Sequence, residues 1–127
     1  MNLRTPLSQV KGLGSAKDGV SHWWMQRLTS VALVPLVLWL GFALASLPGA
    51  DHATFTEWVR SPMVAVLLIL TIVVAFHHGQ MGLQVIIEDY VSHEPTRVAA
   101  IILVKLVAVL FSVIGVYSVL KIALGAG

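Results

Sequence analysis

Two adjacent histidines lie inside a long apolar stretch of this chain. His77 and His78 interrupt the run Pro62 to Ile87, which otherwise carries no charged or titratable side chain. Ionisable groups at membrane depth are costly to bury, and they usually mark a functional site. An imidazole there can ligate a metal, or it can form a hydrogen bond that holds two helices together. The residue type alone leaves both roles open.

Helical spacing places a glycine and a carboxylate on the same side as His78. At 100° per residue, Gly82 lies about 40° and Asp89 about 20° from His78 around the helix axis. A glycine one turn from a ligand histidine leaves room for a flat macrocycle such as haem to approach the backbone. Close helix packing, which small residues promote in membranes, is the alternative. His77 projects about 100° away from His78, so the two cannot bind one metal from the same face.

A haem with two histidine ligands needs a second imidazole at the same depth. The remaining histidines, His22, His52 and His93, fall outside the expected membrane segments. The spacing therefore predicts that another subunit supplies the second axial ligand of any haem bound by His78.

Polar residues at the segment ends are further candidates. Tyr90 follows Asp89 near water, where a tyrosine hydroxyl can donate a hydrogen bond to a carbonyl group. Arg27 lies at the start of the first apolar segment and can form a bidentate pair with a carboxylate. Position alone favours interfacial anchors for Arg27 and Tyr90. The sequence has no Ser-His-Asp arrangement, HExxH motif or membrane carboxylate pair, so we expect no catalysis by this chain alone.

Long apolar segments must position these residues. The chain has 127 residues, of which 57% are hydrophobic and 11% charged, with a mean hydropathy of +0.89. About 20 apolar residues cross a bilayer as a helix, and three such spans are predicted, at about 28–47, 62–90 and 98–120. We therefore predict an all-α membrane protein of one domain, 1–127, that packs with a partner anchor subunit. Lys105 is interpreted as snorkelling to the surface.

Charge predicts the orientation and excludes some functions. Basic residues cluster on one side of the predicted spans, five against two on the other: Arg4, Lys11, Lys17, Arg27 and Arg97 against Arg60 and Lys121. The positive-inside rule then places the N-terminal segment, 1–27, in the cytoplasm. A bacterial inner membrane is preferred because no transit peptide is evident. The net charge of +2 gives no reason to expect nucleic acid, and a chain without cysteine cannot hold iron–sulfur clusters through thiolates.

The stretch from His78 to Tyr90, HGQMGLQVIIEDY, resembles the signature of a known family. That family is the small haem-binding membrane anchor of succinate dehydrogenase (respiratory complex II), the D-type subunit. The segment from His22 to Ser30, HWWMQRLTS, resembles the family's other conserved piece, an arginine followed by small polar residues. The three-helix layout and the size also match, so the resemblance covers essentially the whole chain.

The resemblance implies roles for five residues. His78 would be an axial ligand of the haem b iron, with the second ligand on the C-type cytochrome b anchor subunit. Tyr90, with Asp89 beside it, would help form the ubiquinone site. Arg27 would face the haem propionates. His22 is a weaker haem-edge candidate, because its spacing to Arg27 is shifted by one from the family pattern.

The implied function is to anchor a flavoprotein and an iron–sulfur subunit and to help pass electrons from succinate to quinone. FAD and the clusters would belong to those partners. Three alternatives stay open. One is a fumarate reductase-type anchor that works in the reverse direction, and another is a haem-free structural anchor in which His78 joins two helices. The third is a small transporter using His77, His78 and Lys105, against which the absence of repeats and broken helices counts.

Overall fold

The structure is a computed structural model that describes residues 6–7 and 16–125. Its main elements are the helices α2 (Ala16–Ala45), α3 (His52–Arg60), α4 (Pro62–Tyr90) and α5 (Glu94–Ala123). By length and composition α2, α4 and α5 can each cross a membrane. The predicted all-α fold with three membrane-spanning helices is thus confirmed, and the chain is a multi-pass membrane protein. Residues 1–5 and 8–15 of the predicted N-terminal segment lie outside the described residues.

Local sequence explains where the helices begin. Pro62 and Pro95 stand in the first turns of α4 and α5, where no intrahelical partner is needed for the missing N–H. Asp51 caps α3, because its Oδ1 accepts a hydrogen bond of 2.8 Å from the backbone N–H of Thr54. Gly49, at a φ of +76°, makes the turn between α2 and α3.

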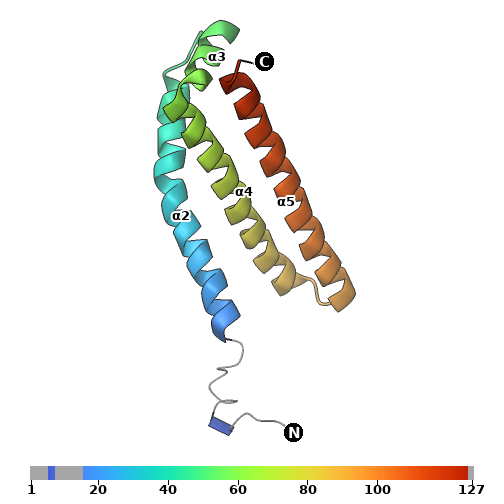
Figure 1. The fold of residues 1–127 in the computed structure, drawn as a ribbon. Helices are drawn as coiled ribbons and strands as arrows, with labels where there is room; N and C mark the ends of the chain where they lie inside the picture. Colours follow the sequence, from blue (N-terminus) through green and yellow to red (C-terminus); the bar gives the residue numbers. More distant parts are fainter. Residues whose placement is uncertain (1–5, 8–15, 126–127) are drawn as a thin grey trace.

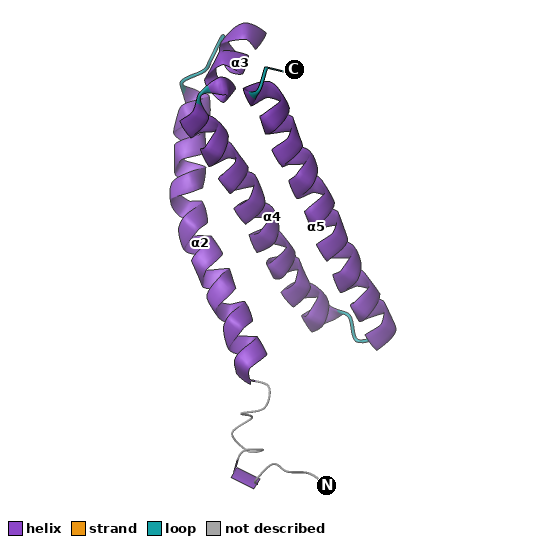
Figure 2. Ribbon diagram, in the orientation of Figure 1, coloured by secondary structure: helices purple, strands orange, loops and turns teal. Residues whose placement is uncertain are grey.

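The helix α4 lies between α2 and α5 and packs against both (Figure 1). Within the described residues α2 and α5 make no direct packing contact with each other. The start of α2, the end of α4 and the start of α5 share one end of the molecule, and α3 lies at the other (Figure 1). Short loops join the helices (Figure 2). This arrangement leaves α4, which carries both candidate histidines, in contact with α2, α3 and α5.

The buried core sits near α3. Val59, Ala65 and Val119 form its centre, from three different helices. Farther along, a Cβ added to Gly115 on α5 would lie 3.0 Å from the side chain of Ile72 on α4, so the glycine permits a close approach. At most 11% of the most apolar window of each long helix is buried. Most of the apolar surface therefore faces lipid or other subunits.

The helices differ from the predicted spans mainly at the start of α2 and in the first loop, and α5, Glu94–Ala123, extends a few residues past 98–120 at both ends. α2 begins at Ala16, well before Leu28, so His22 lies within the helix rather than before it. Hydropathy locates the apolar run, whereas a helix continues through flanking polar residues that have adequate helix propensity. The loop between the first two spans contains the unpredicted helix α3, which the Asp51 cap starts and the buried Val59 fixes to the core.

Candidate functional site

His78 lies where α4 packs against α2. Its Nδ1 atom is 3.0 Å from the hydroxyl oxygen of Thr29. Thr29 and Leu36 are both buried and seven residues apart, so they form one stripe on α2, which packs only against α4 among the described helices. Thr71 on α4 is also buried, seven residues before His78. The packing of α2 on α4 thus holds this histidine in place.

Thr29 is a residue of this site that the sequence pattern does not single out. Its hydroxyl also lies 2.7 Å from the carbonyl oxygen of Met25 and 3.1 Å from that of Gln26. The residue belongs to the stretch HWWMQRLTS, where it counted only as a small polar residue after Arg27. Its partner lies 49 positions away, so only the register between α2 and α4 identifies the pair.

The two glycines near His78 leave open space beside the helix. A Cβ added to Gly79 or Gly82 would meet no atom within 4 Å, apart from the backbone of α4 itself and the glycine's chain neighbours. Packing against the described part of this chain therefore does not explain either glycine. The open surface fits a flat group or a helix from another subunit.

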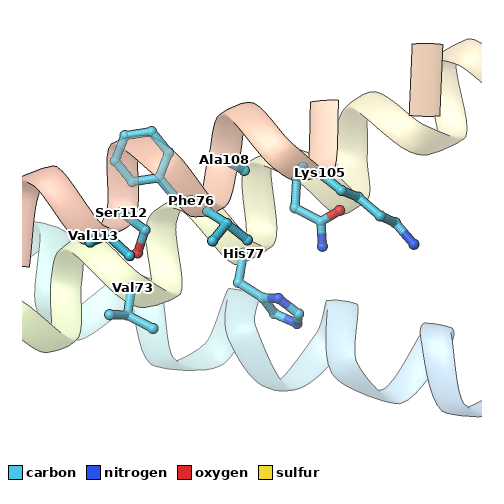
Figure 3. A pocket seen from close by; sticks show the side chains of 9 residues that line it. Val73, Phe76, His77, Lys105, Ala108, Ser112 and Val113 are labelled. Carbon is cyan, nitrogen blue, oxygen red and sulfur yellow. The ribbon is translucent and has the colours of Figure 1, made fainter. Parts of the chain in front are cut away.

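His77 occupies different surroundings. It lines a cleft of about 340 Å³ with Lys105 and Ser112 of α5 (Figure 3). Its Nε2 is buried and makes no hydrogen bond with the described residues. His22 shares a second cleft with His77 and Lys105, and its Nε2 is likewise buried without a described partner. The structure thus brings His22 and His77 to one cleft.

Arg27 does not lie on the His78 side of α2. It precedes Thr29 by two residues, which turns it about 200° around the helix axis. Its side chain is exposed, and its guanidinium carbon lies 5.3 Å from the centre of the Trp23 ring. A cation over an indole face is a favourable arrangement for an exposed arginine. Within the described residues Arg27 is therefore held by an aromatic ring and remains available to an external anion.

Tyr90 and Asp89 lie at the last turn of α4 and are exposed. Tyr90 has 84% of its surface accessible. It is 12 residues from His78, which corresponds to about 18 Å along a helix. The structure therefore keeps the tyrosine and the histidine apart. A site that involves Tyr90 must be completed by groups from outside the described residues.

The sequence of this chain is similar to those of known membrane anchor subunits. Residues 1–114 match the family model described as succinate dehydrogenase/fumarate reductase transmembrane subunit. The succinate dehydrogenase hydrophobic membrane anchor subunit of Rickettsia bellii is 33% identical over 109 residues, which cover 86% of this chain and 87% of that protein. The anchor subunit so named from Paracoccus denitrificans is 29% identical over 126 residues, covering 99% and 97%. No solved structure gives a significant match.

Proposed function

Because this chain belongs to the succinate dehydrogenase/fumarate reductase transmembrane subunit family, as a succinate dehydrogenase hydrophobic membrane anchor subunit, we propose that it holds haem b through His78 and forms part of a ubiquinone site. Its partners would be a flavoprotein, an iron–sulfur subunit and a C-type cytochrome b anchor subunit. FAD and the iron–sulfur clusters would reside in the first two. Membership in this family leaves the transporter alternative without support.

One observation carries the haem proposal. His78 uses a single ring nitrogen, Nδ1, to contact Thr29, and it stands beside the open surface at Gly79 and Gly82. No described residue forms a hydrogen bond to its other nitrogen, Nε2. An imidazole with one nitrogen fixed and the other available is the usual arrangement of a metal-ligating histidine. The residues present therefore fit the group.

The haem would supply one-electron chemistry when bound, and the residues of this chain would position it. His78 would provide one axial ligand. Arg27 would neutralise a propionate, since its guanidinium is exposed and meets only an aromatic ring among the described residues. The second axial ligand would come from the C-type anchor subunit. His22, which faces the His77 cleft, is a weaker candidate for the haem edge.

The quinone site would lie at the end of α4. The Tyr90 hydroxyl would donate a hydrogen bond to a quinone carbonyl, and Asp89 would orient that hydroxyl or relay protons. Quinone reduction takes up two protons, which are available at a water interface. Support comes from the 84% exposure of Tyr90, since that side chain is free to meet a quinone and a partner subunit.

Basic residues support an orientation. Arg27 lies in the first half of α2 and Arg97 in the first turn of α5, whereas Arg60 ends α3 and Lys121 lies in the last turn of α5. The first halves of α2 and α5 point to one end of the molecule and α3 lies at the other (Figure 1). The positive-inside rule places the first end in the cytoplasm. We infer that the N-terminus is cytoplasmic and that the membrane is a bacterial inner membrane. The iron–sulfur subunit would then dock beside Tyr90.

The Thr29–His78 contact also favours a second candidate, a haem-free anchor in which His78 only joins α2 to α4. A fumarate reductase-type anchor would use the same residues. The direction of electron flow would be set by the potentials of the partner subunits and the quinone.

Purification of the tagged chain, expressed with its native partner subunits, tests the proposal. We expect flavoprotein and iron–sulfur subunits to co-purify with succinate:ubiquinone reductase activity and one b-type haem per flavin. A complex with full flavin content and no haem would establish the haem-free anchor. Absence of the flavoprotein from a stable, well-expressed preparation would contradict the proposed partners.

A further inference from the structure

The Thr29 hydroxyl has one proton and three polar neighbours. Its oxygen lies 2.7 Å from the carbonyl oxygen of Met25, 3.1 Å from that of Gln26 and 3.0 Å from Nδ1 of His78. A carbonyl oxygen only accepts hydrogen bonds, and the Met25 carbonyl is the nearest of the three neighbours, which favours a hydroxyl proton directed at the preceding turn. In that arrangement the hydroxyl oxygen accepts the hydrogen bond from Nδ1–H of His78.

This direction determines which nitrogen of His78 carries the proton. A neutral imidazole has one N–H and one lone pair, and the bond made by one nitrogen decides the role of the other. With the proton on Nδ1, the lone pair is on Nε2. We propose that Thr29 is a positioning residue that fixes His78 in the Nδ1–H form and presents Nε2 to the haem iron. The inference rests on the proposed ligation of haem by His78.

The same contact would tune the iron. An acceptor on the N–H of a ligating imidazole raises the basicity of the ligating nitrogen. A hydroxyl is a neutral acceptor, but its loss would still make Nε2 a weaker electron donor. A weaker donor favours the reduced iron over the oxidised iron. Removal of the Thr29 hydroxyl should therefore move the haem midpoint potential to a more positive value.

The fold assigns this role to Thr29 and not to its neighbour. Thr29 is 6% exposed, on the stripe of α2 that faces α4. The next hydroxyl, that of Ser30, donates to the Gln26 carbonyl at 2.7 Å and forms no hydrogen bond with His78. Thr71 gives a matched comparison, because it is 8% exposed and donates to the Leu67 carbonyl at 2.7 Å without contacting a histidine.

Four variants of the assembled complex test the proposal. Thr29→Val removes the hydroxyl and keeps the shape, whereas Thr29→Ser keeps the hydroxyl. Thr29→Ala removes both the hydroxyl and the methyl group on Cβ. It replaces Thr29→Val as the test if the valine does not pack. Thr71→Val removes a matched buried hydroxyl elsewhere on the same helix contact. The midpoint potential of the haem and the low-spin electron paramagnetic resonance signal of its oxidised form are measured for each variant.

We expect Thr29→Val and Thr29→Ala to shift the potential to a more positive value and to move the resonance signal. Thr29→Ser and Thr71→Val should match the unmodified complex. An unchanged potential in Thr29→Val, or an equal shift in Thr71→Val, would overturn the proposal. If both truncations fail to assemble and Thr29→Ser assembles, Thr29 is a folding determinant and the positioning role is wrong.

His78→Ala separates this inference from the proposed function. Retention of haem in His78→Ala would refute the proposed ligation itself. Loss of haem in His78→Ala, with an unchanged potential in Thr29→Val, would refute only the role of Thr29.

Discussion

The Nδ1 atom of His78 on α4 lies 3.0 Å from the hydroxyl oxygen of Thr29 on α2. A histidine inside a membrane helix is expected either to join helices or to bind a ligand. Here the two roles are compatible, because the contact with Thr29 uses Nδ1 and leaves Nε2 available for a ligand. The contact therefore joins the helix pair and leaves Nε2 available for the proposed ligation.

Substitution of the two neighbouring histidines should have different effects. We expect His78→Ala to abolish or strongly weaken haem binding, because it removes the proposed axial ligand. His77→Ala should largely spare haem, because His77 faces the cleft with Lys105. The haem content per flavin of the purified complexes measures both. Equal loss in the two variants would mean that the choice between the histidines is wrong.

Tyr90→Phe should lower quinone reduction. The loss of one neutral hydrogen bond predicts a decrease of roughly two- to tenfold in succinate:quinone reductase activity. Succinate oxidation with an artificial electron acceptor should be unchanged. Tyr117→Phe is the control, since Tyr117 is also an exposed tyrosine, 64% accessible, but on α5. A parallel fall of both activities in Tyr90→Phe would indicate a structural role.

Arg27→Gln should make the haem midpoint potential more negative. A positive charge near a propionate stabilises the extra electron of reduced iron, so its removal favours the oxidised form. Arg60→Gln, an exposed arginine at the opposite end of the molecule, should leave the potential unchanged. Redox titration of the two complexes gives the comparison. An unaltered potential in Arg27→Gln would place the propionates away from this residue.

The Asp51 cap predicts a pH dependence in α3. The backbone N–H of Thr54 holds the pKa of the Asp51 carboxyl below its ordinary value of 3.8. A lowered pKa in the folded state means that the carboxylate stabilises α3 above pH 3.8 and that this contribution is lost as the pH falls through the lowered value.

Asp51→Ala should therefore speed hydrogen exchange of the Thr54 amide at neutral pH. Below the lowered pKa the unmodified chain and the variant should exchange alike. Exchange of the first turn of α3, measured by mass spectrometry in detergent, makes the comparison. Equal exchange at neutral pH would show that the cap does not protect this turn.

Sequence predicts the fold better than the site. The three spans follow from apolar runs, because a membrane helix must be apolar over about 20 residues. The helix ends do not follow, so His22 appears inside α2 although it was expected before the span. Thr29 and His78 are 49 residues apart in the sequence. They meet only through the register between α2 and α4, which no local pattern encodes. The assignments of Arg27, Asp89 and Tyr90 remain predictions, because other subunits must complete those sites.

A reduced-minus-oxidised difference spectrum of the assembled complex, with succinate as the reductant, tests the central claim most directly. We expect a b-type band that appears with succinate and that is missing from His78→Ala complexes with the same flavin content. A flavin-replete complex without that band would contradict haem binding. A band seen only with dithionite would contradict the transfer of electrons from succinate to this haem.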